Sequence, residues 1–137
     1  MMFVVTQAGN ADVQNTASTT PVVATPSTLA IGNTVEMAVR EYFKDEPILI
    51  EIARCESTFK QFNEDGSIRR GKVNDADVGV MQINEYYHLD TSKTKGYDIY
   101  TLEGNMAYAR DLYERQGAQP WSSSSPCWSA AGQIASK

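Results

Sequence analysis

The sequence predicts an α+β fold that is mostly helical and carries one small antiparallel sheet. Residues 47–56 and 106–113 place apolar side chains at helical spacing. Between them, Asp65-Gly66 separates two short runs of residues, which is a hairpin signal. A chain of 137 residues is long enough to bury a hydrophobic core as a single domain.

The first 33 residues differ in composition from the rest of the chain. Residues 12–33 are rich in Thr, Ser, Asn, Pro, Ala and Val, and Asp12 is their only charged residue. We therefore expect 1–33 to be a signal-peptide remnant or a disordered tether, and 34–137 to be the folded domain. The short apolar run at the start favours export, although it lacks the basic residues of a complete signal peptide.

The first two helices are expected at the start of this domain. Asn33 or Thr34 is a suitable N-cap for a helix that continues to Tyr42. A turn follows, and Pro47 suits the first position of a second helix. That second helix carries the chain to Glu56, at the end of an apolar face.

The remaining elements are shorter, apart from one further helix. A hairpin is expected over 59–72, followed by a turn at 74–77 and an irregular or helical stretch from Asn84. A helix follows Gly104-Asn105 and stops near Gly117. Residues 120–128 then form a loop with a short helical end.

The charge balance excludes several classes of protein. Lys and Arg number 12 and Asp and Glu number 17, so the formal net charge is −5. A nucleic-acid binder needs a basic face, and anionic lipid attracts basic segments, so neither partner is expected. The sequence contains no run of about 18 apolar residues, so no integral membrane segment is expected. We expect a monomer.

Two cysteines, Cys55 and Cys127, bear on compartment and stability. They are too few for a four-ligand zinc site, and His88 is the only histidine, so no metal or other cofactor is expected. A disulfide between them would close a long loop and stabilise the fold by about 4 kcal/mol in an oxidising compartment. Two unrelated buried thiols are the alternative.

Glu56 and Asp77 form the candidate catalytic pair. Glu56 lies among apolar neighbours, so burial should raise its pKa and keep it protonated, whereas Asp77 lies in a polar turn and should stay ionised. Glycoside hydrolysis uses two such carboxyl groups: one protonates the leaving oxygen and the other stabilises or attacks the sugar centre. Two solvated surface acids are the alternative when spacing alone is considered.

The segments around these acids resemble a known superfamily. Arg54-Cys55-Glu56-Ser57-Thr58-Phe59 resembles the Glu-Ser-x-Phe signature of the lysozyme superfamily. The Asp-Val-Gly-Val-Met-Gln-Ile-Asn run at 77–84 resembles the Asp-x-Gly-x-x-Gln-Ile-Asn segment of animal-type lysozymes. It equally resembles the Gly-Leu-Met-Gln-Ile segment of soluble lytic transglycosylases.

Later segments extend this resemblance over about residues 45–130. The helix with Asn105, Tyr108 and Leu112 looks like a later helix of the transglycosylase family. The pairs Pro120-Trp121 and Cys127-Trp128 resemble its aromatic C-terminal region. Because the segments occur in the correct order at compatible spacing, the resemblance implies a lysozyme-like fold.

The resemblance also implies roles for individual residues. Glu56 matches the general acid, and Asp77 matches the second carboxylate of the animal-type enzymes. Gln82 and Asn84 match positions that shape the glycan cleft, and Met81 matches a position that packs against or lines it. The implied activity is cleavage of the β-1,4 bond between N-acetylmuramic acid and N-acetylglucosamine in peptidoglycan, by an exported bacterial or phage enzyme without a cofactor.

Three readings of the function stay open. Asp77 favours hydrolysis, whereas a lytic transglycosylase would form a 1,6-anhydro end with Glu56 returning as base. A non-catalytic glycan-binding module would keep the same cleft. A structural or adhesive exported domain would use residues 12–33 for display.

The aromatic residues also have two interpretations each. Trp121 and Trp128 either stack on sugar rings or pack in the core, and Tyr108 either lines the cleft or packs in the core. His88 is expected to be a surface or hydrogen-bonded residue and not a catalyst. Ser122–Ser125 is expected to be a loop without a nucleophile.

Overall fold

The computed structural model describes residues 28–129, and the side chains of 34–129. Of the tether or signal remnant expected over 1–33, residues 1–27 lie outside the described residues. The described part is α+β, as predicted. Its elements in chain order are α1 (Thr28–Tyr42), α2 (Pro47–Ser57), β1 (Asp77–Val78), β2 (Ile83–Asn84), α3 (Glu85–Thr94), α4 (Leu102–Gln116) and the 3-10 helix η2 (Gln119–Ser124).

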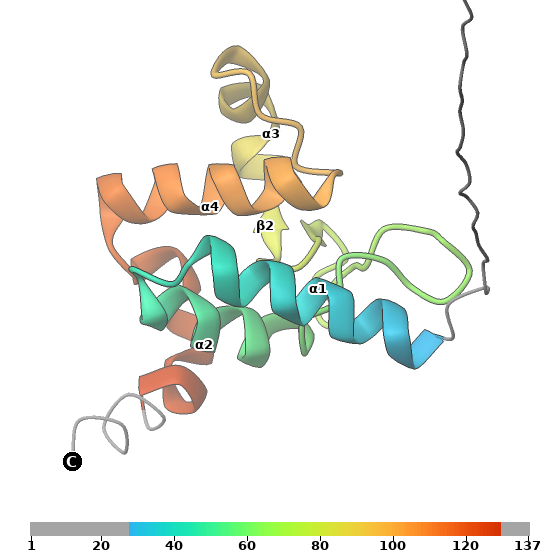
Figure 1. The fold of residues 1–137 in the computed structure, drawn as a ribbon. Helices are drawn as coiled ribbons and strands as arrows, with labels where there is room; N and C mark the ends of the chain where they lie inside the picture. Colours follow the sequence, from blue (N-terminus) through green and yellow to red (C-terminus); the bar gives the residue numbers. More distant parts are fainter. Residues whose placement is uncertain (1–27, 130–137) are drawn as a thin grey trace, which may run out of the picture.

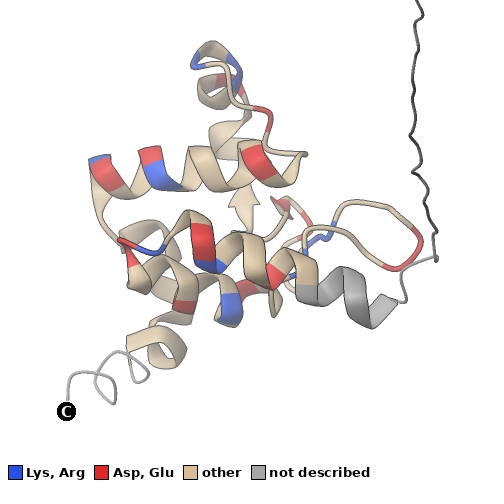
Figure 2. Cartoon of the chain, viewed as in Figure 1, with Lys and Arg blue, Asp and Glu red and all other residues tan. Residues whose placement is uncertain are grey.

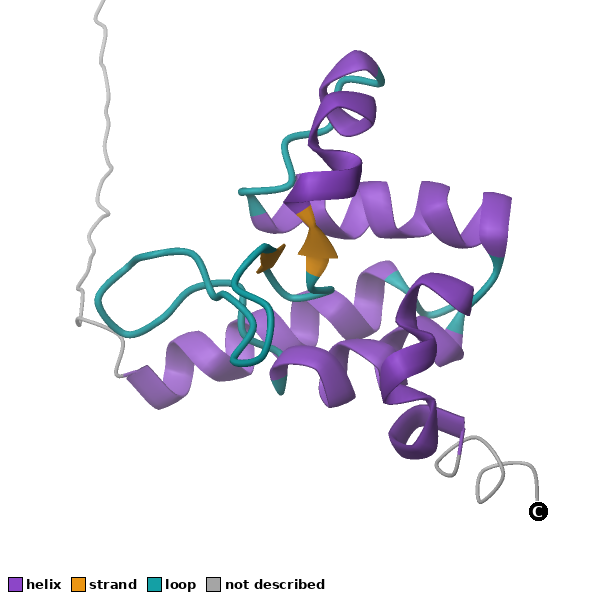
Figure 3. Cartoon of the chain, turned by 180° about the vertical axis from the view of Figure 1, so that it is seen from behind, coloured by secondary structure: helices purple, strands orange, loops and turns teal. Residues whose placement is uncertain are grey.

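The helices enclose the short strands from several sides. Helix α1 packs against both α2 and α4, and η2 packs against α2 and α4. In Figure 1, α4 lies above α1 and α2, and β2 leads up to α3 at the far end. Seen from behind in Figure 3, the two strands lie between α4 and the α1–α2 pair. A short helical turn at 125–129 follows η2.

The ends of the helices follow their local sequence. Pro47 opens α2, as predicted, and α2 ends where Thr58 and Phe59 adopt positive φ angles of 51° and 61°. Thr101 caps α4 by accepting a hydrogen bond from the Gly104 amide at 3.0 Å. Helix α4 ends at Gly117, the predicted stop, with a φ of 65°.

The start of the first helix differs from the prediction. Helix α1 begins at Thr28, ahead of the expected cap at Asn33 or Thr34. The apolar and small residues of 28–32 continue the helix because they contain no proline, and Pro26 lies before its start. The composition change near residue 33 therefore lies inside this helix.

The sheet forms at a different place from the one predicted. The hairpin expected over 59–72 is reduced to a turn with an isolated bridge between Phe62 and Ile68. The two-stranded ladder is instead β1–β2, with Asp77 opposite Asn84 and Val78 opposite Ile83. Val78 and Ile83 are buried, whereas the 62–67 turn is exposed, so only the later pair gains stability from the core.

Among residues 34–129, a hydrophobic cluster lies under the strands and between the helices. Most of its buried side chains come from α1, α2, α4, η2, the two strands and the segment between the strands. The largest fully buried apolar and aromatic side chains are Tyr108, Phe43, Leu49, Ile52, Met81, Ile83, Ile99 and Leu112. This cluster fixes the position of the strands against α2 and α4.

Charged residues are distributed over the outside of these elements. In Figure 2, acidic and basic segments alternate along α1 and α4. Arg110 of α4 donates to Glu46 at 2.7 Å and so ties α4 to the turn before α2. Within 28–129, none of the helices combines the length and apolar character that crossing a membrane requires.

Candidate active site

A pocket of about 290 Å³ lies between the end of α2, the strands and η2. Five of the predicted site residues line it: Glu56, Asp77, Gln82, Asn84 and Trp121. The fold therefore brings the two candidate carboxyl groups into one cavity, although they are far apart in the sequence. Tyr87 and His88 of α3 also line this pocket.

Glu56 is half-buried at the last turn of α2. The Ser124 hydroxyl donates a hydrogen bond to its Oε1 atom at 2.5 Å. Burial raises the pKa of Glu56 above its ordinary value of 4.5, and the charge of Asp77 raises it further, against the hydrogen bond from Ser124. The direction agrees with the sequence-based expectation of a carboxyl group kept protonated by its surroundings.

Asp77 is held by its partner in the strand ladder. Its Oδ1 atom accepts a hydrogen bond from the Asn84 side-chain amide at 2.8 Å. The carbonyl oxygen of the same Asn84 side chain accepts from the Tyr87 backbone amide at 3.2 Å and so caps α3. Asn84 therefore fixes both the second carboxyl group and the start of the helix that supplies Tyr87.

The segment between the strands is held by side chains and not by a longer sheet. Four buried side chains of the described part bind the backbone of residues 78–81, and we call them the polar clamp: Ser57, Gln61, Asn105 and Trp121. Ser57 donates to the Val80 carbonyl at 2.7 Å, and Gln61 accepts from the Val80 amide at 2.8 Å. These two bonds fix residue 80 from the side of α2.

Asn105 and Trp121 complete the polar clamp from the other side. Asn105 accepts from the Met81 amide at 2.9 Å and donates to the Val78 carbonyl at 3.0 Å. Trp121 donates to the Met81 carbonyl at 2.8 Å. Because these side chains are buried, they replace water at every backbone group that they bind.

Gly79 is required where the polar clamp closes around the backbone. Its φ is +78°, and a Cβ atom there would lie 2.3 Å from Nδ2 of Asn105 and 2.8 Å from Oε1 of Gln61. Any side chain would therefore displace the groups that hold residues 78–81. The Gly79 carbonyl in turn accepts a hydrogen bond from the Gln82 side chain at 2.9 Å.

Three predicted contact residues play other parts. Met81 and Tyr108 are fully buried and do not line the pocket, because both pack in the hydrophobic core. This burial supports the core interpretation of Tyr108. Trp121 lines the pocket but is only 2% exposed, so it forms the floor, with its ring nitrogen occupied by Met81.

His88 connects this core to the pocket. Its Nδ1 atom lies 3.0 Å from the Tyr108 hydroxyl, which confirms the prediction of a hydrogen-bonded histidine. Burial, and then the charge of Arg115, lowers the pKa of His88 below its ordinary value of 6.5. The imidazole is therefore neutral at pH 7. Within 28–129, no three His, Cys, Asp or Glu side chains are grouped to hold a metal ion.

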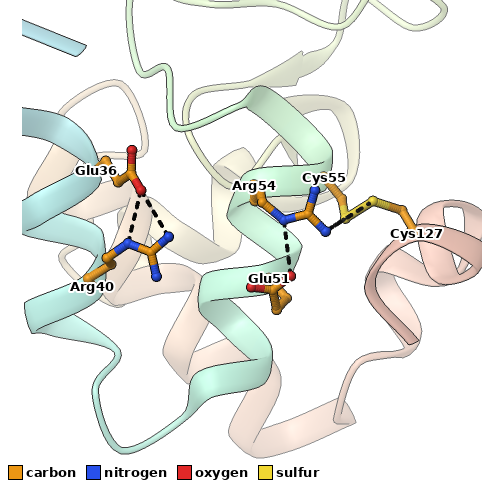
Figure 4. A network of polar contacts seen from close by, with 6 residues as sticks. All are labelled: Glu36, Arg40, Glu51, Arg54, Cys55 and Cys127. Atoms are coloured by element: carbon orange, nitrogen blue, oxygen red, sulfur yellow. Dashed lines mark hydrogen bonds and ion pairs between the residues drawn. A yellow bond between two sulfur atoms is a disulfide. The ribbon is translucent and has the colours of Figure 1, made fainter. Parts of the chain in front are cut away.

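A disulfide joins α2 to the last described residues. Cys55 and Cys127 are bonded, with their Cα atoms 6.1 Å apart, so the predicted disulfide is confirmed and the two-thiol alternative is wrong. Figure 4 shows the Arg54 guanidinium beside both sulfur atoms, at 3.5 Å from Cys55 and 3.7 Å from Cys127. Arg54 also donates to Glu51 at 3.0 Å.

Sequence reasoning missed the residue that touches Glu56. Ser124 was expected to be part of a loop. Its contact with Glu56 arises from the packing of η2 against α2, which the sequence does not indicate. Gln61 gave no signal either, because its partner is a backbone amide 19 residues away. Trp128 donates to the Trp121 carbonyl at 3.0 Å, so it braces η2 and does not contact the pocket.

Comparison with known proteins gives no family assignment. No family model, no curated protein and no solved structure matches this chain.

Proposed function

We propose that this protein is a muramidase, which cleaves the β-1,4 bond between N-acetylmuramic acid and N-acetylglucosamine in peptidoglycan. The observation that carries the proposal is a carboxyl group with a raised pKa, Glu56, in a pocket that it shares with a second carboxyl group, Asp77. Two carboxyl groups in different environments are the arrangement that glycoside cleavage needs. The resemblance of both segments to the lysozyme superfamily supports the same activity, and a lysozyme-like fold is part of the proposal.

Glu56 acts as the general acid in this proposal. Its raised pKa keeps a larger fraction of the group protonated near neutral pH, so it can donate a proton to the glycosidic oxygen. Protonation makes the departing sugar a neutral alcohol and not an alkoxide. The half-buried position between α2 and η2 supports this role because an acid in open solvent would be ionised.

Asp77 stabilises the positive charge that develops at the sugar carbon, or it positions a water molecule. The Asn84 amide holds Oδ1 of Asp77, which fixes the carboxyl group without neutralising it by a cation. If water then attacks, the product has a reducing muramic acid end. If the 6-hydroxyl of the sugar attacks, a 1,6-anhydro end forms and Glu56 acts as base in that step.

The polar clamp supports the proposal through rigidity. It fixes residues 78–81 between Asp77 and Asn84, and so it sets the distance between the second carboxyl group and the floor at Trp121. Catalytic groups held in this way keep their positions and orientations during the reaction. The disulfide is consistent with an exported protein, which is the location that a wall substrate requires.

Digestion of purified peptidoglycan tests the proposal. We expect the wild-type protein to release muropeptides, and Glu56→Gln to reduce the rate by at least about a hundredfold, because general-acid catalysis typically contributes 10²–10⁴-fold. Glu41→Gln is the matched control, since Glu41 lies exposed on α1 and away from the pocket. Mass spectrometry of the sugar ends distinguishes hydrolysis from 1,6-anhydro formation.

Two outcomes contradict the proposal. Cleavage by Glu56→Gln at the wild-type rate would remove Glu56 from the acid role. Binding of purified peptidoglycan without any cleavage by the wild-type protein would favour the glycan-binding module instead. Folding of each variant is checked by its thermal unfolding midpoint, so that loss of structure is not mistaken for loss of the acid.

A further inference from the structure

The hydroxyl group of Ser124 is the one described side chain that hydrogen-bonds Glu56. It lies 2.5 Å from Oε1 of Glu56 and 3.1 Å from the Trp121 carbonyl oxygen. A serine hydroxyl has a single hydrogen to donate, so it cannot serve both acceptors fully at once. The shorter contact is the one to Glu56.

The Trp121 carbonyl has a second donor, which releases Ser124 for Glu56. The Trp128 ring nitrogen donates to that carbonyl at 3.0 Å. The buried carbonyl is therefore satisfied without Ser124. The hydroxyl hydrogen is free to point at Oε1, and the two oxygens of Glu56 become different from each other.

The second oxygen of Glu56, Oε2, has no hydrogen-bond partner within 34–129. In a neutral carboxyl group the carbonyl oxygen accepts hydrogen bonds better than the hydroxyl oxygen, so the oxygen that accepts from Ser124, Oε1, is favoured as the carbonyl oxygen. The proton of the neutral acid therefore resides on Oε2. That oxygen belongs to a side chain that lines the pocket.

We propose that Ser124 is a positioning residue for Glu56: by donating to Oε1, it keeps the transferable proton on Oε2. This inference rests on the proposed function. During cleavage the proton passes from Oε2 to the glycosidic oxygen, and the electron pair of the breaking C–O bond goes to that oxygen. Glu56 becomes an anion, and the bond from Ser124 becomes a charge-assisted hydrogen bond.

The structure holds Ser124 in place by a covalent bond close to Glu56. Cys55 precedes Glu56 in α2, and it is bonded to Cys127, which lies three residues after Ser124. Two neighbouring residues of the last turn of α2 are thus tied to one short segment, one by a disulfide and one by a hydrogen bond. A loop serine without this tie would lose its orientation by rotation of the backbone.

The test compares Ser124→Ala with Ser124→Thr, and it uses Ser122→Ala as the matched control. Ser122 lies in the same helix η2, is exposed and does not line the pocket. The readouts are the pH dependence of kcat/KM on peptidoglycan and the titration of Glu56 by carboxyl ¹³C NMR. Thermal unfolding and thiol counting confirm that each variant is folded and has an intact disulfide.

We expect Ser124→Ala to lower the maximum of kcat/KM about tenfold or more, since catalysis depends steeply on the orientation of the acid. Loss of a hydrogen bond to the ionised carboxylate raises the pKa of Glu56, so the alkaline limb of the profile moves to higher pH. Ser124→Thr keeps the hydroxyl and is expected to restore both the rate and the limb. Ser122→Ala is expected to match the wild-type protein.

Failure of this inference is distinct from failure of the proposed function. If the wild-type protein cleaves and Ser124→Ala matches Ser122→Ala, the positioning role is overturned and the muramidase assignment stands. A lower rate with an unmoved alkaline limb would also overturn it, since general loss of order predicts that pattern. If the wild-type protein does not cleave peptidoglycan, the proposed function and the role of Ser124 in it are both overturned.

Discussion

The two walls of the pocket are held by different kinds of interaction. The wall that carries Asp77 is fixed by the polar clamp, whose four side chains come from α2, the segment after it, α4 and η2. The wall that carries Ser124 is tied to α2 by one disulfide and one hydrogen bond. One wall is therefore fixed by several buried polar bonds, whereas the other is joined to α2 by one disulfide and one hydrogen bond.

This difference separates the two carboxyl groups in their sensitivity to change. The backbone beside Asp77 is held by the four side chains of the polar clamp, and the Asp77 carboxyl group is held by Asn84. Glu56 depends on the short segment after Trp121, which is largely exposed. We therefore expect the position of the Glu56 carboxyl group to vary more than the position of the Asp77 carboxyl group.

Removing the disulfide breaks the second wall and should have the largest effect on stability. Its 72-residue separation corresponds to about 4 kcal/mol of unfolding free energy in the chain-entropy model. We expect the double variant Cys55→Ser, Cys127→Ser to lose about that amount in urea unfolding. Wild-type protein unfolded with a reductant should give the same value, and a loss below about 1 kcal/mol would contradict this account.

Asn105→Ala breaks the first wall, with a somewhat smaller effect. It leaves the Met81 amide and the carbonyls of Val78 and Ile99 without their buried partner. We expect a loss of about 3 kcal/mol in urea unfolding, because each buried group left unsatisfied costs about 1–3 kcal/mol and such losses are not additive. Asn63→Ala, in an exposed turn, is the control and should cost under about 1 kcal/mol; equal losses for both variants would show that the polar clamp contributes nothing particular.

Glu56→Gln should have the smallest effect, and it should stabilise the protein. The pKa of Glu56 is raised above 4.5 in the folded state, so below 4.5 the group is protonated whether the chain is folded or not. As the pH rises, the unfolded state ionises first and wild-type stability falls until the folded pKa is passed. The variant should therefore be more stable at pH 7 and equal to the wild type near pH 3. A stability difference that does not change with pH would contradict the raised pKa.

Sequence patterns were sufficient where the cause is local. Pro47 and the apolar repeat after it predict α2, and Gly117 predicts the end of α4. The motifs around Glu56 and Asp77 predicted two residues that the fold does bring into one pocket. The disulfide followed from the presence of two cysteines in a chain with features of export.

The same patterns failed where the cause is packing between distant segments. Asp65-Gly66 does form a turn, but the strand ladder lies at 77–84. The polar clamp and the burial of Val78 and Ile83 stabilise strands at 77–84, and the exposed turn has no such support. Tyr108 has the spacing of a core residue and of a cleft residue alike, and burial decided between them. Ser124 could not be found in advance, because nothing in a run of four serines marks the one that faces α2.

Hydrogen exchange at the amides of Val80 and Met81 can measure how often the wall that carries Asp77 opens. These amides donate to the side chains of Gln61 and Asn105 and not to another strand. Each amide hydrogen can therefore exchange for deuterium only when its hydrogen bond to that side chain breaks. Deuterium uptake at these two positions therefore reports how often the wall of Asp77 opens, independently of the wall of Ser124. A fragment of glycan bound in the pocket should slow that exchange.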